Sequence, residues 1–167
     1  MKRLNSFFLN ITVQILDSLY AERHLQRFWV LEVIARSPYF AFLSVLHFKE
    51  SLGIQNDRTM FLMKEHFYQA INETEHLIEM EKRGGNKSWI DRFLARHLVL
   101  IYYWFMVIYY LVSPQNAYDI NIKIEEHAFH TYSKYLEKFP NDTKIKEIAQ
   151  DEKHHIEELN EALSKII

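Results

Sequence analysis

Cysteine is absent from this chain of 167 residues, and glycine and proline each occur only three times. Without cysteine the chain has no disulfides, no thiolate catalysis and no cysteine-based zinc site. Because glycine and proline are so scarce, turns are few and elements are long, which favours an all-helical protein. The charges nearly balance, with 20 Lys and Arg against 22 Asp and Glu, so we expect no nucleic-acid partner. The length fits one domain spanning 1–167.

Glycine, proline and polar capping residues interrupt the apolar helical patterns of the sequence, and these interruptions predict six helices. Apolar residues at helical spacing predict a short amphipathic N-terminal helix, followed by a bundle over 26–165. Pro38 predicts a kink in the second helix, and two glycines end the third. Asn141, Asp142 or Thr143 is expected to cap the last helix. The expected ranges are 7–20, 27–50, 56–83, 89–112, 117–138 and a final helix from that cap to the C-terminus.

The apolar run 98–112 has 15 residues and is rich in Tyr and Trp. It is shorter than the roughly 20 residues that a spanning helix needs. Tyr and Trp favour the interface between membrane and water. We therefore expect two membrane-associating helices beside the bundle, one carrying this run and one over 7–20. No cleaved signal is expected, because polar residues interrupt the apolar stretch near the N-terminus and no small-residue cleavage site follows.

Two Glu-x-x-His pairs, Glu73 with His76 and Glu152 with His155, are the most informative motif. Residues three apart share one face of a helix, so each pair can bind a metal ion. Two such helices, with one inward glutamate from each of two more, form the di-metal site of ferritin-like four-helix bundles. Glu32, within an apolar run, is one candidate for the remaining glutamates. Either residue of the pair 125–126 is the other, and spacing alone does not choose between them.

Each motif has a less specific reading when taken alone. A single Glu-x-x-His arises by chance in helices rich in Glu and His. Glu32 could face solvent or pair with a buried arginine such as Arg27. The whole constellation favours metal ligands. Oxygen and nitrogen ligands without sulfur suit iron or manganese, and carboxylate bridges favour iron, so we expect two non-haem iron ions and an oxygen-using enzyme.

Other polar residues lie at spacings that suggest supporting roles. Asn72 and Asp151 each precede a ligand glutamate, so each can reach the imidazole of the opposite helix. Tyr132 follows Glu125 by seven residues, which is two turns on the same face, although it could simply pack in the core. We expect His127 and His130 to hydrogen-bond near the site or relay protons rather than bind metal.

The segments 31–47, 72–76, 125–132 and 151–155 resemble the alternative oxidase family, and more narrowly its plastid terminal oxidase branch. This resemblance implies a redox role for Tyr132 and a quinol pocket near Arg27, Ala128 and Thr131, with Arg23 as a further candidate. It also chooses Glu125 over its neighbour. The iron ligands that it implies are Glu32, Glu73, His76, Glu125, Glu152 and His155.

The resemblance further implies that plastoquinol or a related quinol is oxidised while O2 is reduced to water, and we expect no proton pumping. It implies a homodimer bound to one leaflet of a thylakoid or cytoplasmic membrane of a cyanobacterium-type cell. Only 26 residues separate Glu125 from Glu152, fewer than is usual in the family. Together with the lack of a transit peptide, this suggests a short bacterial or phage-borne version. The alternatives are a di-iron quinone-ring hydroxylase and an iron-storage or structural bundle.

Overall fold

A computed structural model describes residues 2–166, and within that range all regular secondary structure is helical. The expected all-α class and the expected order of helices are confirmed. The helices are α1 Lys2–Tyr20, α2 His24–Ser51, α3 Asp57–Lys82, α4 Trp89–Val112, α5 Pro114–Lys138 and α6 Thr143–Ile166.

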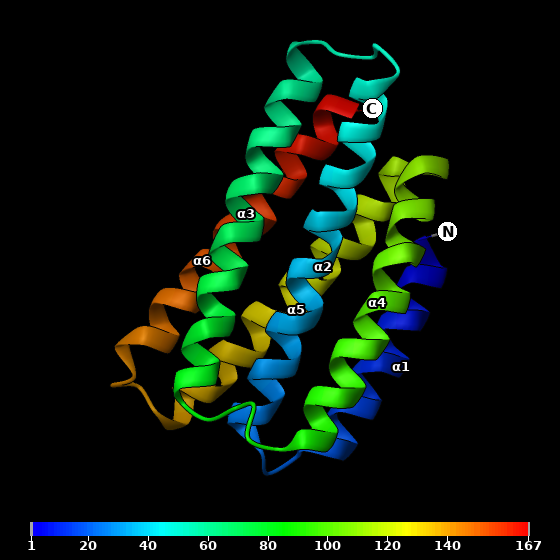
Figure 1. Ribbon diagram of the computed structural model, residues 1–167. Helices are drawn as coiled ribbons and strands as arrows, with labels where there is room; N and C mark the ends of the chain where they lie inside the picture. The colour runs from blue at the N-terminus through cyan, green and yellow to red at the C-terminus, as the bar shows by residue number, and fades with distance from the viewer. Residues whose placement is uncertain (1, 167) are drawn as a thin grey trace.

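Four of these helices, α2, α3, α5 and α6, form a bundle, and α1 and α4 lie along one side of it (Figure 1). Within the bundle α2 packs against α3, and α5 packs against α6. Outside it, α4 packs on α2, and α1 packs on α5. This is the predicted ferritin-like four-helix bundle with two additional helices.

Three helices begin earlier than the sequence predicted, and α2 is one of them, since it starts at His24 rather than 27. α1 starts at residue 2 rather than 7, because its first turn docks onto α5 through the buried side chain of Asn5. The amide nitrogen of Asn5 donates to Asp119 and to the carbonyl oxygen of Asn116, at 2.9 Å each. α5 starts at Pro114 rather than 117, since proline suits the first turn, where its missing N–H is not needed. α2 continues through Pro38 to its predicted end.

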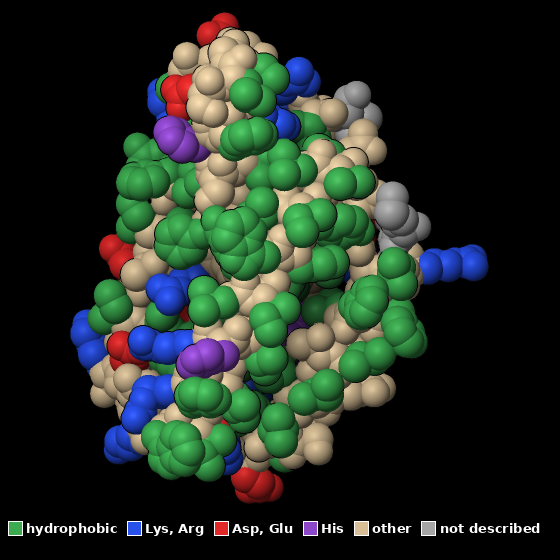
Figure 2. All heavy atoms as spheres, turned by 45° about the vertical axis from the view of Figure 1, so that its right-hand side comes forward, with side chains coloured by type: hydrophobic (Ala, Val, Ile, Leu, Met, Phe, Trp, Pro, Cys, Tyr) green, Lys and Arg blue, Asp and Glu red, His purple; other side chains and the backbone are tan. Residues whose placement is uncertain are grey.

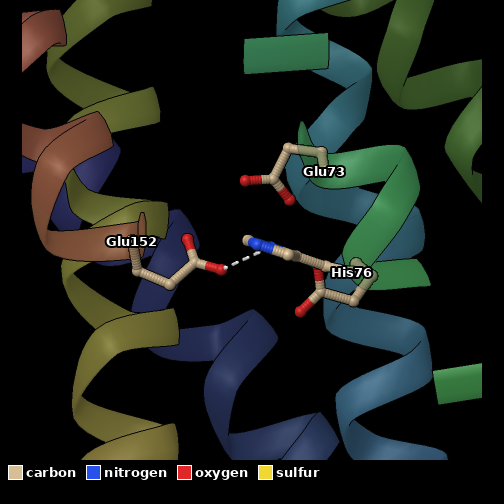
Figure 3. Close-up of side chains that lie close together, drawn as sticks. Glu73, His76 and Glu152 are labelled. Carbon is tan, nitrogen blue, oxygen red and sulfur yellow. Dashed lines mark ion pairs between the residues drawn. The ribbon is translucent and has the colours of Figure 1, made fainter. Parts of the chain in front are cut away.

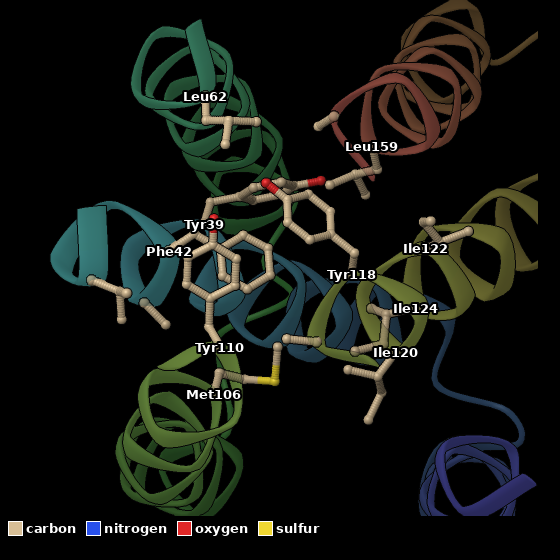
Figure 4. Close-up of a cluster of buried hydrophobic side chains, with 14 of the residues drawn as sticks. Tyr39, Phe42, Leu62, Met106, Tyr110, Tyr118, Ile120, Ile122, Ile124 and Leu159 are labelled. Atoms are coloured by element: carbon tan, nitrogen blue, oxygen red, sulfur yellow. The ribbon is translucent and has the colours of Figure 1, made fainter. Parts of the chain in front are cut away.

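The core consists of two buried apolar clusters that succeed one another along the bundle. One includes Tyr39, Phe42, Tyr110 and Tyr118 (Figure 4), and the other includes Phe28 and neighbours from α3, α5 and α6. On α3, α5 and α6 the predicted ligand glutamate falls, in sequence, between residues of one cluster and residues of the other, and on α2 Glu32 lies three residues before Ala35, the first α2 residue of the cluster that includes Tyr39. The acidic side chains therefore occupy a polar layer sealed by apolar residues at both ends.

Asp142 caps α6, as one of the three predicted candidates, and also ties it to the end of α3. Its Oδ1 accepts from the backbone N–H of Ile145 at 3.2 Å, and Arg83 donates to both carboxylate oxygens at 2.7 and 3.1 Å. We expect Asp142→Ala to lower the free energy of unfolding by about 1–2 kcal/mol, because the cap is lost and Arg83 loses a partner. Denaturant unfolding of the metal-free protein measures this, with the exposed neighbour changed in Asn141→Ala as a control that should leave stability unaltered.

Candidate metal centre and neighbouring pocket

The six predicted ligands meet in the polar layer of the bundle. Each is at most 4% exposed, and they come from all four bundle helices. They form two groups, and within each group the potential donor atoms lie within 4.8 Å of one another. Glu73 and Glu152 belong to both groups, and Figure 3 shows both turned toward the bundle interior with His76 between their helices. The first group adds Glu32 and His76, and the second adds Glu125 and His155.

Burial decides between the two adjacent glutamates of α5. Glu125 is 0% exposed and belongs to the second group, whereas Glu126 points to solvent. The choice that spacing left open is thus made by the rotation of α5 about its axis, in agreement with the family resemblance.

Most donor atoms of this cluster have no hydrogen bond to the described residues. Ion pairs between the ligands themselves join some of them, such as His155 Nδ1 and Glu73 Oε1 at 2.9 Å, or His76 Nδ1 and Glu152 Oε1 at 3.3 Å. Buried polar atoms without a hydrogen bond are costly, so an accumulation of them calls for a ligand. Four carboxylates would also balance the charge of two divalent cations, and the residues present therefore fit a two-metal centre. The atoms without a hydrogen bond are Glu32 Oε2, both carboxylate oxygens of Glu73 and of Glu152, Glu125 Oε2, and the Nδ1 atoms of His76 and His155.

The electrostatics of the cluster point the same way. Burial raises the pKa of Glu32 to about 8, and burial together with the charge of Glu73 raises the pKa of Glu125 well above its ordinary value. Burial alone would lower the pKa of His155, but its contacts with Glu152 and Glu73 outweigh burial and raise the pKa to about 10. Burial would raise the pKa of Glu152 as well, but its contacts with His155 and His76 outweigh burial and lower it. Protons held on Glu32, Glu125 and His155 thus offset part of the negative charge of the cluster, a role that bound cations can take over.

Among residues 2–166, no arginine is paired with Glu32. Arg27 instead pairs with Asp17 of α1, at 2.6 Å between Nη1 and Oδ1. Within the described chain, the side chain next to Glu32 that can carry a positive charge is His76, whose Nδ1 lies 3.6 Å from Glu32 Oε2. The arginine alternative considered for Glu32 therefore does not hold for Arg27.

Asp151 lies where it was expected to hold an imidazole in place. Its Oδ2 is 3.1 Å from Nε2 of His76, which leaves Nδ1 of that ring directed at the cluster. This hydrogen bond to His76 also lowers the pKa of Asp151. Asn72, expected to act in the same way on His155, instead has a buried Oδ1 that carries no hydrogen bond to the described residues.

Two buried tyrosines donate to ligand carboxylates. The hydroxyl of Tyr132 donates to Oε1 of Glu32, so the predicted proximity of Tyr132 to the cluster is observed. The hydroxyl of Tyr39 donates to Oε1 of Glu125 at 2.8 Å, a contact that the sequence analysis missed. Tyr39 follows Glu32 by seven residues, so the spacing used to single out Tyr132 would have found it.

A cavity of about 370 Å³ opens between α1, the start of α2 and α5, and its wall residue Phe28 packs on Tyr132. Arg27 and Thr131 line it, as the resemblance implies, and His127 and His130 line it too rather than contacting the cluster. Nε2 of His127 is 3.4 Å from both Nη2 of Arg27 and Oγ1 of Thr131. The other lining residues are Val13, Asp17, Ala21, His24, Phe28, Lys134, Tyr135 and Lys138.

The two remaining predicted pocket residues lie outside this lining. Ala128 is 1% exposed and packs in the core one turn before Tyr132. Arg23 pairs with Asp91 of α4, which also accepts from the hydroxyl of Tyr20 at 3.1 Å. Arg23 therefore links the start of α2 to α4.

Apolar side chains cover the surface that α1 and α4 present, which we call the α1–α4 face (Figure 2). Over the described residues, α2 and α4 are long and apolar enough to cross a membrane by length and composition, but 72% of the α2 window is buried in the protein against 11% for α4. The exposed apolar residues of this face include Leu4, Phe7, Phe8, Ile11, Ile15 and Leu19 on α1, and Leu98, Ile101, Trp104, Phe105, Ile108 and Val112 on α4.

A family model described as alternative oxidase matches residues 3–159 of the chain. Among curated proteins, the chain is 47% identical over 133 residues to ubiquinol oxidase 4, chloroplastic/chromoplastic, of Arabidopsis thaliana, covering 80% of this chain and 37% of that protein. It is 29% identical over 129 residues to the mitochondrial ubiquinol oxidase of Mangifera indica, covering 75% of this chain and 40% of that protein. No solved structure matches the chain significantly.

The chain thus spans about two fifths of the length of these two relatives. Its identity to the chloroplast protein clearly exceeds that to the mitochondrial one, as the sequence resemblance implied. The family match runs through all four bundle helices and includes all six residues of the candidate metal centre. The chain belongs to the alternative oxidase family, on its plastid terminal oxidase branch.

Proposed function

We propose that this chain is a quinol:oxygen oxidoreductase, which oxidises plastoquinol or a related quinol and reduces O2 to water at a non-haem di-iron centre. The observation that carries this proposal is the buried double ligand group, most of whose donor atoms have no hydrogen bond to the described residues, and which lies beside a cavity. Relatives named ubiquinol oxidases support the substrate class and do not favour the quinone-ring hydroxylase.

The two groups of ligands divide the metal ions between them. Glu32 and His76 would hold one iron, and Glu125 and His155 the other, with Glu73 and Glu152 shared. Carboxylate and imidazole ligands without sulfur suit iron. When bound, such a centre supplies electron transfer between quinol and oxygen. Asp151 fixes the tautomer of His76, since a hydrogen bond to Nε2 leaves Nδ1 free for metal.

The cavity is suited to a quinol head group. The guanidinium of Arg27 can donate to a quinone oxygen without losing its charge, and His127 beside it can accept a hydroxyl proton. Burial and the nearby charge of Arg27 lower the pKa of His127, which keeps this imidazole neutral and able to accept. Phe28 forms part of the wall and packs on Tyr132, with ring centroids 4.6 Å apart. Tyr132 thus stands between cavity and ligands, placed to pass an electron and a proton.

Oxygen uptake tests the function. The iron-loaded protein in detergent or lipid, given a short-chain quinol in the presence of cyanide, should consume one O2 for every two quinols. Since each quinol gives two electrons, this ratio corresponds to complete reduction of O2 to water. Labelled oxygen recovered in the quinone would instead support the hydroxylase, and uptake absent despite two bound irons would contradict the proposal.

We also propose that the α1–α4 face lies in one membrane leaflet, where a lipid-soluble quinol can reach the cavity. α4 packs along α2 and not away from the bundle, so its exposed side can enter the leaflet while the bundle stays outside. Chloroplast and mitochondrial relatives and the two apolar helices support a membrane location. The particular membrane, thylakoid or cytoplasmic in a cyanobacterium-type cell, is part of this proposal.

Charges placed on this face should weaken membrane binding. Ile101 and Ile108 are 69% and 60% exposed, so Ile101→Glu with Ile108→Glu disturbs little packing but opposes insertion. We expect the double variant to lose most of its co-sedimentation with lipid vesicles. The matched control is Ile54→Glu, a change at a residue 52% exposed in the connection between α2 and α3, which should sediment like the unaltered protein. Equal sedimentation of the double variant and the control would contradict this placement.

We also propose that the chain forms a homodimer. The outer side of α2 and α3 exposes Phe40, Phe67, Ile71 and Ile78, a set of large apolar side chains apart from the α1–α4 face. A second copy of the chain would bury such a patch. Light scattering in detergent, which gives the molar mass of the protein, distinguishes a dimer from a monomer.

A further inference from the structure

A buried hydrogen-bonded chain lies beside the metal centre and has no part in the proposed quinol oxidation. His66 on α3 and Tyr118 on α5 each precede a ligand by seven residues, Glu73 and Glu125 respectively. Seven residues are two helical turns, so both side chains share the faces of the ligands about 10 Å further along the helix axes. Both are 0% exposed.

The direction of each hydrogen bond in this chain can be assigned. Nε2 of Gln69 is 3.0 Å from Oε2 of Glu158, and because a carboxylate accepts, the amide donates. Oε1 of Gln69 then faces Nδ1 of His66 at 2.9 Å, so the imidazole carries its proton on Nδ1. Nε2 of His66 is left to accept from the hydroxyl of Tyr118, at 2.5 Å. Tyr118 is thus a phenol whose proton already points at a neutral base.

The imidazole is neutral because burial lowers the pKa of His66 to about 4. When it does receive a proton, the resulting charge has a partner through Gln69, because Glu158 ends the chain. Oε1 of Glu158 is also 3.1 Å from Nε2 of the exposed His154, so the chain reaches the protein surface.

One aromatic residue, Tyr39, contacts both this pair and a metal ligand. The ring of Tyr39 is 6.0 Å from that of His66, and its hydroxyl donates to Glu125. The ring of Phe42 stacks on Tyr118 at 5.0 Å (Figure 4). Electrons tunnel readily between aromatic rings whose centres are this close. Tyr39 contacts both His66 and the ligand Glu125, so it links the pair to the metal centre.

We propose that Tyr118 and His66 form a second oxidisable pair, which takes an oxidising equivalent from the metal centre when no quinol is bound. This inference rests on the proposed function, since the oxidant is the iron centre after it has reacted with O2. Tyr118 gives one electron to that centre, its O–H bond breaks, and the proton passes to Nε2 of His66. A later quinol would give two electrons to the centre. One of them returns to Tyr118, and the proton on Nε2 of His66 goes back to its oxygen, which restores the phenol.

The position of Tyr118 and His66 suits the storage of an oxidising equivalent rather than the direct oxidation of quinol. Tyr132 packs on Phe28 of the cavity wall and belongs to the same apolar cluster, whereas Tyr118 belongs to the other cluster. A quinol in the cavity is therefore separated from Tyr132 by one ring, while Tyr118 lies beyond the ligand layer. An oxidising equivalent stored on Tyr118 is held away from the ligand side chains, which would otherwise be its nearest targets.

Electron paramagnetic resonance of the iron-loaded protein tests the pair without relying on activity. Protein carrying Tyr132→Phe, grown on ring-deuterated tyrosine, is reduced, mixed with O2 without quinol, and frozen at intervals. We expect a tyrosyl signal whose width reports the label. Adding Tyr118→Phe should remove most of this signal. Adding Tyr20→Phe, a change at a tyrosine on α1 that is 6% exposed and donates to Asp91, should leave it. His66→Leu, which removes the proton acceptor, should also abolish it and serves if Tyr118→Phe does not fold.

A signal that survives Tyr118→Phe and His66→Leu would overturn the pair. Quinol-driven oxygen uptake is measured separately, on iron-loaded protein that keeps Tyr132, because Tyr132→Phe is itself expected to lose turnover. Uptake in that protein, with no radical signal that depends on Tyr118, refutes the pair alone. Absence of both uptake and radical refutes the proposed function and the pair with it. A second readout is survival under O2 without quinol, where Tyr118→Phe should lose its own starting activity faster than Tyr20→Phe does.

Discussion

Glu73→Ala is expected to abolish both iron binding and oxygen uptake. Glu73 is one of two carboxylates that belong to both ligand groups, so its loss removes a donor from both ions at once. Losing a residue that only hydrogen-bonds to a metal ligand lowers metal affinity by up to roughly a hundredfold. Glu73 is itself a ligand, so we expect the affinity for iron to fall by more than that. Metal analysis after desalting, together with oxygen uptake driven by quinol, measures this.

The matched control is Glu75→Ala, two residues along the same helix at an exposed position. It removes the same charge without touching the cluster, so iron content and uptake should be unchanged. If Glu73→Ala kept two irons per chain, Glu73 would be a structural carboxylate, and the assignment of the ligands would have to be withdrawn.

Tyr132→Phe should keep the iron and lose turnover. The change removes one buried oxygen atom that donates to Glu32, while all six ligand side chains remain. If Tyr132 passes an electron and a proton between cavity and metal centre, turnover should fall by roughly a hundredfold or more, as for other positioned proton-transfer groups. Quinol-driven oxygen uptake at matched iron content measures the effect.

Tyr110→Phe is the control for this change, because Tyr110 is also buried but is not hydrogen-bonded to a ligand in the described structure. It should retain uptake. Full activity in Tyr132→Phe would remove the redox role from Tyr132 and leave it as a side chain that orients Glu32.

Much of the fold follows from local features of the sequence. The scarcity of glycine and proline predicted long helices, and all six were found in the expected order. The boundary that moved furthest is the start of α1, where a tertiary contact adds a turn because Asn5 bonds to Asp119. Such a contact joins residues more than a hundred positions apart, so no local pattern reports it.

The sequence by itself determined the Glu-x-x-His pairs, because residues three apart must share a helical face whatever surrounds the helix. It also gave a basis for Tyr132, seven residues from Glu125. The same spacing links Tyr39, His66 and Tyr118 to ligands, but it shows only that they share a face and not that they meet.

Only the tertiary structure decided what lies opposite each side chain. The rotation of α5 buries Glu125 and exposes Glu126, and the docking of α1 gives Arg27 the carboxylate of Asp17 in place of Glu32. The register between α3 and α5 brings Tyr118 to His66. Helical periodicity relates residues within one helix, whereas contacts between helices depend on rotation and register, which are set by how the whole core packs.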